Sequence, residues 1–223
     1  MTRKTLAVWI GLAVVAVACG GDGGEAVDTA AYAAFRDQPT ACGADQPEAA
    51  TELEFDAPGN AEVTEPTRAI LHTSCGRVVI EVDSALAPET VNSFVFLAEE
   101  GYFDGTVSHR VVPDFIIQAG DPTATGRGGP GYVLPDEYPD ADFTYTTGTV
   151  AMANAGPGTV GSQFFLVLDD IVLPPEFPVF GRVVEGFDVL DRMTQVPLAP
   201  NPGDFQPSRP LETIYLERVE ISR

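Results

Sequence analysis

The sequence predicts a mainly β domain, built as a closed antiparallel barrel and preceded by an N-terminal tether. Short runs rich in β-branched and aromatic residues recur from about residue 67 to the end, and Gly and Pro separate them. Within that region, only two segments carry apolar residues at helical spacing. Many short strands with few helices favour a sheet that closes on itself. A chain of 223 residues with 44% hydrophobic residues suits one domain with tails better than two domains.

Composition excludes several classes of partner. Acidic residues outnumber basic ones 33 to 12, which gives a formal net charge of -21. Such a surface repels nucleic acid and anionic lipid headgroups, so we expect neither as a direct partner. The three cysteines form no CxxC pair and the chain has only two histidines, so we expect no structural metal and no cofactor.

The first residues resemble an export signal. Two basic residues precede an uncharged, mostly apolar run from Leu6 to Ala18. This run is shorter than the ~20 residues that span a bilayer, and it fits the apolar part of a secretory signal. The small residues before Cys19 resemble the lipobox of bacterial lipoproteins. We therefore expect residues 1–18 to be removed and Cys19 to carry the lipid that provides the only membrane contact. Plain secretion after cleavage at an Ala-x-Ala site is the alternative.

Residues 19–66 predict an acidic tether and a partly ordered extension. They are rich in Ala, Gly, Asp, Glu and Pro, with one short helical patch around Val27 to Arg36. If Cys19 carries a lipid, Cys42 and Cys75 remain as a pair, and an oxidising compartment permits a disulfide between them. The bond would tie the extension to the start of the domain. Two free thiols are the alternative.

The domain itself is expected over residues 67–223 and opens with a hairpin and a helix. Residues 68–73 and 77–83 have β-rich composition, and the Ser-Cys-Gly turn between them indicates a hairpin. Pro88 suits the first turn of a helix, and Gly101 can end that helix in a left-handed cap.

Short strands dominate the rest of the domain. The β-type runs are residues 106–112, 115–119, 148–153, 163–168 and 179–183. Residues 184–195 predict a second helix because apolar side chains recur there at three-residue spacing. Residues 211–221 alternate between apolar and polar side chains and predict a closing strand.

Two long segments resemble the signatures of the cyclophilin family. Ser108 to Asp121 reads SHRVVPDFIIQAGD, and Met152 to Phe165 reads MANAGPGTVGSQFF. Shorter matches lie at residues 86–94, 101–106 and 179–183. The resemblance covers roughly residues 67–222 and leaves out the first 65. It implies an eight-stranded antiparallel barrel closed by two helices. It also implies a peptidyl-prolyl cis–trans isomerase that acts, as a monomer, on proline-containing polypeptides and assists the folding of exported proteins.

The resemblance also assigns roles to individual residues. Arg110 matches the catalytic arginine of the family, and Gln118 is expected to support it. The positions that line the proline pocket or hold the substrate backbone correspond to Phe115, Ile116, Ala153, Asn154, Gln163, Phe165, Leu173 and Phe177. For the apolar positions the alternative is simple barrel core, and for Arg110 it is a surface salt bridge.

These residue types suit the chemistry. Turning an X–Pro bond breaks amide resonance, so the proline nitrogen regains a lone pair in the twisted transition state. A charged donor aimed at that nitrogen stabilises the transition state more than the planar ground state. No nucleophile, metal or acid–base pair is needed, so we expect a structural or peripheral role for His109.

Four positions depart from the family pattern. Ser108 stands where a phenylalanine is usual, and Ile116 replaces a common methionine. Val172 falls where many members carry a tryptophan, and Phe177 falls where many carry a histidine. Because Val172 lacks an indole N–H donor, we expect weaker cyclosporin binding than in tryptophan-bearing members. The alternative to an active isomerase is a weakly active or inactive proline-peptide binding module, or holdase.

Overall fold

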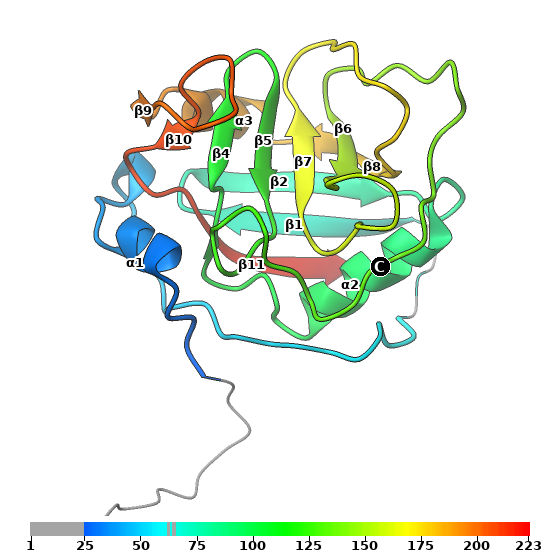
Figure 1. The fold of residues 1–223 in the computed structure, drawn as a ribbon, viewed down its shortest axis with the longest axis horizontal. Helices are drawn as coiled ribbons and strands as arrows, with labels where there is room; N and C mark the ends of the chain where they lie inside the picture. Colours follow the sequence, from blue (N-terminus) through cyan, green and yellow to red (C-terminus); the bar gives the residue numbers. More distant parts are fainter. Residues whose placement is uncertain (1–24, 62, 64–65) are drawn as a thin grey trace, which may run out of the picture.

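The computed structural model describes residues 25–61, 63 and 66–223, and its centre is a curled, antiparallel, nine-stranded sheet (Figure 1). In spatial order the strands are β3 (Thr106–Val107), β11 (Tyr215–Ser222), β1 (Thr67–Thr73), β2 (Gly76–Val82), β8 (Val179–Glu185), β6 (Thr149–Met152), β7 (Phe164–Val167), β5 (Ile116–Ala119) and β4 (Arg110–Val112). The prediction of a mainly β, barrel-like domain is confirmed. The expected signal at residues 1–18 and lipid site at Cys19 lie outside the described residues.

The two edges of the sheet are joined by a two-residue connection. The edge strands β3 and β4 follow one another in the chain, separated only by Ser108 and His109. The Ser108 N–H donates to the carbonyl of Ile214, just before β11, at 2.9 Å, whereas Arg110 pairs across to β5. The single strand expected over residues 106–112 is therefore split in two. In Figure 1, β4, β5 and β7 run across β1, β2 and β11, so the sheet curls around its core.

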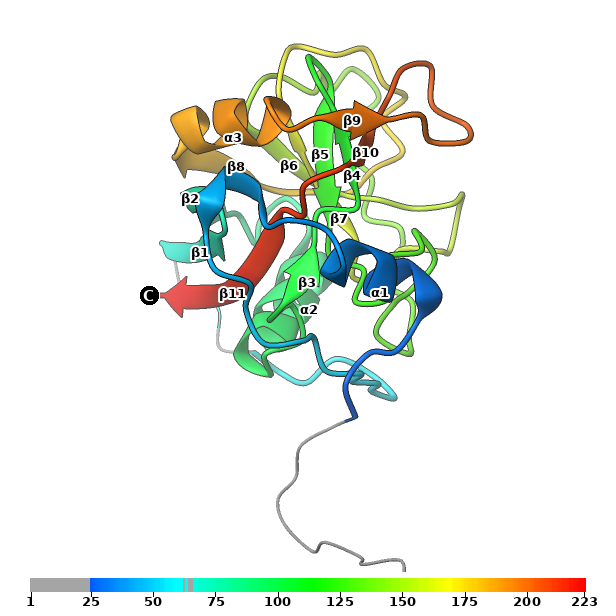
Figure 2. The same cartoon turned by 90° about the vertical axis from the view of Figure 1, so that its left-hand side faces the viewer.

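Two helices cover opposite ends of the curled sheet (Figures 1 and 2). Helix α2 (Pro88–Glu99) has proline in its first turn, as expected, and buries one face in the core. The centroid of the Phe94 ring on that face lies 4.9 Å from the centroid of the Phe180 ring and 5.5 Å from that of the Phe164 ring. Helix α3 (Phe187–Thr194) buries Val189, Leu190 and Met193 against the other end. The segments predicted as helices are both found.

Part of the N-terminal extension packs against the domain. Helix α1 (Ala30–Arg36) lies within the predicted helical patch, and the Thr29 side chain caps it by accepting from the Tyr32 N–H. The buried Tyr32 hydroxyl donates to the Gly105 carbonyl at 2.8 Å and accepts from the Ala50 N–H at 2.7 Å. Burying a hydrogen-bonded aromatic side chain is favourable, so this segment forms its own small core with the domain.

A disulfide joins the extension to the first hairpin. Cys42, in the short 3₁₀ helix Ala41–Gly43, bonds to Cys75 in the turn between β1 and β2. Of the alternatives left open by the sequence, the bridge is the one found. Arg192 of α3 donates to the Cys75 carbonyl at 3.0 Å, so the same turn is held from a second direction.

Two short strands were not expected from the sequence. Strands β9 (Leu198–Ala199) and β10 (Arg209–Pro210) form a separate two-stranded pair that packs beside β4. Two-residue strands carry no periodicity, so pattern analysis misses them. No helix among the described residues has both the length and the apolar character needed to cross a membrane.

Candidate active site

Arg110 on β4 and Gln118 on β5 face each other because they are cross-strand partners. The antiparallel register pairs Arg110 with Gln118 directly, which puts both side chains on one face of the sheet. Arg110 Nη1 donates to Gln118 Oε1 at 3.3 Å. Gln118 Nε2 in turn donates to Gln163 Oε1 at 3.0 Å. The structure therefore brings three of the predicted site residues into one hydrogen-bonded row.

The row depends on a close approach between the two signature segments. Gly120, at the end of β5, has a φ of +87°, and a Cβ at this position would lie 2.4 Å from the Ser162 carbonyl oxygen. The Ser162 hydroxyl donates to the Gly120 carbonyl at 2.7 Å. Only glycine permits both this backbone conformation and this contact. The approach sets Gln163 beside Gln118.

Asp204 binds the Arg110 guanidinium on the side opposite Gln118, a contact that the sequence did not predict. Its carboxylate accepts from Arg110 Nε at 3.0 Å and from Arg110 Nη2 at 2.6 Å. Asn201 and Ser208 also donate to this carboxylate. The hydrogen bonds from Arg110 hold the pKa of Asp204 below its usual value, although partial burial acts in the opposite direction. The two partners lie 94 residues apart, and no motif surrounds Asp204, so no local sequence signal could have found it.

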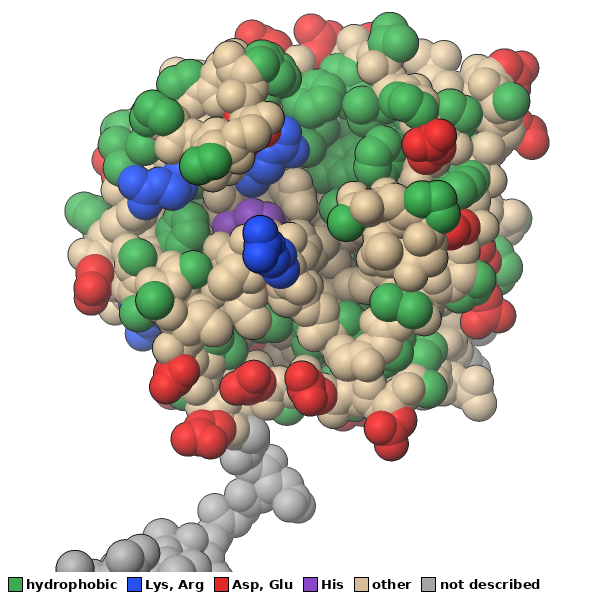
Figure 3. Space-filling view, in the orientation of Figure 1, with side chains coloured by type: hydrophobic (Ala, Val, Ile, Leu, Met, Phe, Trp, Pro, Cys, Tyr) green, Lys and Arg blue, Asp and Glu red, His purple; other side chains and the backbone are tan. Residues whose placement is uncertain are grey.

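The predicted proline-pocket residues belong to one apolar cluster. Ile116 and Phe165 are buried in it, and it also contains Phe115, Ala153, Leu173 and Phe177. The Phe165 and Phe177 rings meet edge to face with centroids 5.6 Å apart. The last four side chains are only partly buried, which leaves apolar surface open to a ligand. Figure 3 shows apolar side chains lining a hollow on this face, with basic side chains and a histidine next to it.

Tyr145 holds one wall of the cluster and was not anticipated. Its hydroxyl donates to the Phe177 carbonyl at 2.9 Å and accepts from the Phe177 N–H at 3.2 Å. Burial raises the pKa of the Tyr145 phenol, so the hydroxyl stays protonated and can make both bonds. The phenol therefore fixes the segment that carries Phe177 against Phe165.

Ala153 and Asn154 extend the wall beyond β6. The Ala153 N–H donates to the Gln163 carbonyl at 2.8 Å, so that amide is already paired within the protein. Asn154 Nδ2 donates to the Glu176 carbonyl at 2.7 Å, which ties its segment to the loop before β8. Main-chain pairing with a substrate at Ala153 can therefore involve its carbonyl but not its amide.

His109 and Val172 lie outside the row and the cluster. The His109 side chain is buried, and its Nδ1 has no hydrogen-bond partner among the described residues. Burial lowers the pKa of His109, partly against the attraction of Asp121. Val172 is fully exposed, so its side chain contributes nothing to the apolar hollow.

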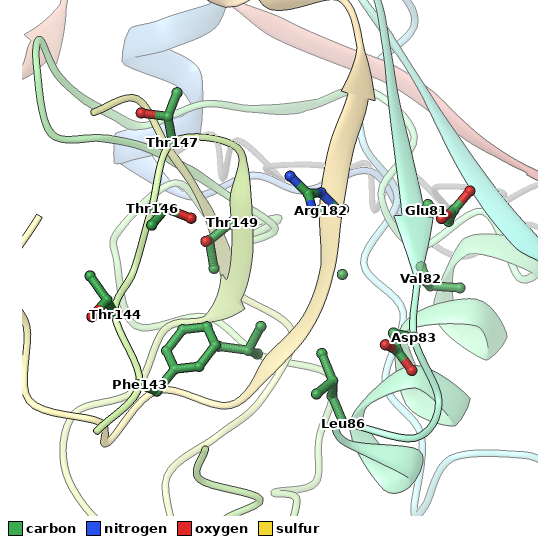
Figure 4. Close-up of a pocket in the computed structure, with 12 residues that line it drawn as sticks. Glu81, Val82, Asp83, Leu86, Phe143, Thr144, Thr146, Thr147, Thr149 and Arg182 are labelled. Carbon is green, nitrogen blue, oxygen red and sulfur yellow. The ribbon is translucent and has the colours of Figure 1, made fainter. Parts of the chain in front are cut away.

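A further cavity has a different character. It has a volume of about 510 Å³ and lies over β2, β6 and β8, where four threonines, two carboxylates and Arg182 surround it (Figure 4). It shares no residue with the row or with the predicted pocket. Among the described residues, no group of three or more His, Cys, Asp or Glu side chains could hold a metal ion.

Comparison with known proteins identifies related sequences. The family model "Cyclophilin type peptidyl-prolyl cis-trans isomerase/CLD" matches residues 68–221. Peptidyl-prolyl cis-trans isomerase ppi1 of Schizosaccharomyces pombe is 42% identical over 66% of this chain and 97% of its own length. Probable peptidyl-prolyl cis-trans isomerase B of Mycobacterium tuberculosis is 39% identical over 61% of this chain, and that match spans 49% of the relative.

A solved structure shares the fold. A cyclophilin type peptidyl-prolyl cis-trans isomerase of Cryptosporidium parvum, crystallised in the presence of the dipeptide Ala-Pro, superposes with a TM-score of 0.63. The two proteins are 29% identical, and the match covers 70% of this chain and 99% of that one.

Proposed function

Because this chain belongs to the cyclophilin-type peptidyl-prolyl cis–trans isomerase family, we propose that it isomerises X–Pro bonds of exported polypeptides with Arg110 as its catalytic residue. One observation carries the proposal. The Arg110 guanidinium, whose side chain is 22% exposed, is held by Gln118 and Asp204 beside an apolar hollow that can take a proline ring. The solved relative crystallised with Ala-Pro supports a proline-containing ligand.

Arg110 acts by charge and geometry. Two of its N–H donors are fixed by Asp204 and a third points at Gln118, so the guanidinium plane is set before substrate arrives. A preorganised donor needs no reorganisation when the proline nitrogen pyramidalises, and it stabilises that state selectively. Gln118, itself held by Gln163, is a positioning residue for the arginine.

Arg110→Ala tests the catalytic proposal. We expect kcat/KM for an X–Pro peptide to fall about a hundredfold, because removal of one preorganised donor commonly costs that much. Arg110→Lys keeps the charge but loses the planar fork, and it should remain well below wild type. Arg77→Ala, which removes an exposed ion pair with Glu185, serves as the control and should leave turnover unchanged. Wild-type turnover by Arg110→Ala would refute the proposal.

A binding module that turns over poorly is the second candidate function. It is favoured by the Asp204 contact, because a guanidinium that is already paired has less positive field to offer. The same assay separates the two candidates. A binding module would bind proline peptides with equal affinity before and after Arg110→Ala and would not exceed the spontaneous isomerisation rate in either form.

Export and lipid anchoring at Cys19 complete the proposal. The Cys42–Cys75 disulfide supports a location outside the cytoplasm, since disulfides persist in oxidising compartments. The intact mass of the mature protein tests this part. We expect loss of residues 1–18 and a lipid mass that Cys19→Ala abolishes. A mature protein cleaved at a different site and without lipid would favour plain secretion.

A further inference from the structure

Two cavities flank the Arg110–Gln118 pair, and each contains one further arginine. The first, of about 420 Å³, lies between Phe35 of α1 and the segment 201–204, and Arg209 lines it. The second, of about 330 Å³, lies between the segments 126–133 and 153–163, and Arg127 lines it. Both cavities share Gln118 with the row, so they continue the proposed active site on either side.

Neither guanidinium has a hydrogen-bond or ion-pair partner among the residues that the structure describes. By contrast, Arg68, Arg77 and Arg192 bind carboxylates, whereas Arg182, which lines the cavity of Figure 4, also lacks a partner among the described residues. In a chain with 33 acidic residues, partners for an exposed guanidinium are abundant. Two unpaired arginines in the cavities on either side of Arg110 and Gln118, together called the groove, therefore point to an anion that the protein does not itself supply.

The walls of both cavities carry an excess of positive charge. Among the described residues, Asp204 is the only carboxylate that lines the first cavity, and Arg110 already neutralises it through three hydrogen bonds. No carboxylate from the described part of the chain lines the second cavity. Figure 3 shows basic side chains gathered around the histidine on this face, while most acidic side chains lie towards the periphery and one borders the apolar hollow.

The backbone of each arginine is anchored to the site. Thr125 Oγ1 accepts from the Arg127 N–H at 3.1 Å, and the next carbonyl, that of Gly128, accepts from Gln163 Nε2 at 3.0 Å. Ser208, which precedes Arg209, accepts from the Val111 N–H at 2.8 Å through its carbonyl. The segments that carry both arginines are therefore hydrogen-bonded directly to the row or to its strand.

We propose that Arg209 and Arg127 form two anion subsites that select peptides with acidic side chains on either side of the isomerised proline. This rests on the proposed function, because it places the proline ring in the hollow beside Arg110. An extended peptide advances about 3.3 Å per residue, so carboxylates within roughly three positions of the proline come within reach of these long side chains.

The large negative charge of the whole molecule does not cancel this preference. At physiological ionic strength the Debye length is about 8 Å, so carboxylates at the periphery are screened from a ligand in the groove. Direct contacts with the two arginines then decide the local selectivity, and added salt should weaken that selectivity.

A peptide series tests the proposal. Each peptide carries Glu, Gln or Lys at one of the three positions before or after a single proline, and kcat/KM is measured by NMR exchange. We expect the wild type to favour Glu over Gln by about threefold to fivefold on each side, which is the upper range for partly exposed ion pairs. Arg209→Gln should remove the preference on one side of the proline, and Arg127→Gln should remove it on the other.

Arg182→Gln is the matched control. It removes the same charge from an exposed arginine that also has no partner among the described residues, but that lines the separate cavity of Figure 4. We expect it to leave the Glu preference intact. The proposal is overturned if the wild type shows no Glu preference or if Arg182→Gln weakens that preference as much as the other two changes. If Arg110→Ala abolishes turnover while no Glu preference exists, the inference fails and the proposed function stands; wild-type turnover by Arg110→Ala sinks the proposed function itself.

Discussion

Asp204 changes what Arg110 can do, because an arginine with free rotamers is a poor catalyst. The carboxylate fixes two N–H groups of the guanidinium and leaves Nη1 with Gln118. Charge-assisted bonds of this kind are both short and directional. Pairing with Asp204 weakens the positive field of Arg110 at the proline nitrogen. In an efficient enzyme, the gain from fixing the guanidinium in one orientation must outweigh this weaker field.

Asp204→Asn should lower kcat/KM about tenfold. The amide keeps the volume of the side chain but loses the charge that holds the fork, and hydrogen bonds to charged groups are worth about 1.5–3 kcal/mol. Gln118 and the apolar cluster are unchanged, so KM should move less than kcat. Asp191→Asn, at an exposed position on α3, is the charge-matched control. Faster turnover by Asp204→Asn would mean instead that the carboxylate restrains the enzyme.

His109 makes folding stability depend on pH. Burial lowers its pKa in the folded protein, so the unfolded chain binds the proton more readily. The contribution of neutral His109 to stability is therefore fully present above the pKa of the unfolded chain, about 6.5. It is lost as the pH falls below that value. A single group of this kind contributes a slope of at most about 1.4 kcal/mol per pH unit.

Urea unfolding of wild type and His109→Gln between neutral and mildly acidic pH measures this effect. The wild type should lose stability over that interval, and the variant should lose less. His72 is present in both proteins and so cancels from the comparison. Equal slopes for the two proteins would show that His109 does not titrate on unfolding in this range.

Residues within the two signature segments were the predictable part of the site. Arg110, Gln118, Phe165 and their neighbours were assigned from contiguous motifs, and the structure brings them together. Asp204 and Tyr145 were not predictable, because each acts through a single long-range hydrogen-bond partner. A lone Asp or Tyr in a loop carries no periodicity and no spacing, so only the fold reveals it.

Elements show the same division. Strands and helices with clear periodicity, such as the β1–β2 hairpin and α2, were found within a residue or two of their predicted bounds. The run over residues 106–112 was predicted as one strand because composition cannot show that Ser108 bonds to a different neighbour from Arg110. Strand β10 has only two residues and is too short to leave a pattern.

The disulfide should stabilise the domain through the extension. Cys42 and Cys75 lie 33 residues apart, and a cross-link of such a loop restricts the unfolded chain by about 3–4 kcal/mol in the chain-entropy account. The double variant Cys42→Ser/Cys75→Ser should therefore melt roughly 10 °C lower than wild type.

Calorimetry with and without reductant completes that test. Reductant should bring the wild type down to the melting temperature of the double variant and should leave the variant unchanged. Because Arg192 also holds the Cys75 carbonyl, the hairpin turn itself should persist after reduction. An unchanged melting temperature in the double variant would mean that the extension contributes little to folding of the barrel.

Charge is the property that belongs to the molecule as a whole. With 33 acidic and 12 basic side chains, most carboxylates have no basic partner available in the chain. Arg68 and Arg77 form exposed ion pairs, Arg110, Arg127 and Arg209 lie in or beside the proposed active site, and Arg182 lines the separate cavity of Figure 4. Like charges repel across such a surface and destabilise the compact state, while keeping the protein soluble.

Moderate salt should therefore raise the melting temperature at neutral pH. Exposed ion pairs such as Arg68–Glu81 weaken in salt, but each is worth at most about 1 kcal/mol, and they are outnumbered by repulsive pairs. Most of the gain should come as NaCl rises to about 0.15 M, where the Debye length reaches about 8 Å. Repeating the melts at acidic pH, with the carboxylates protonated, should remove the effect, because screening then has little repulsion to relieve. A melting temperature that falls with salt at neutral pH would show that the ion pairs outweigh the repulsion, and that the acidic surface is balanced locally despite its net charge.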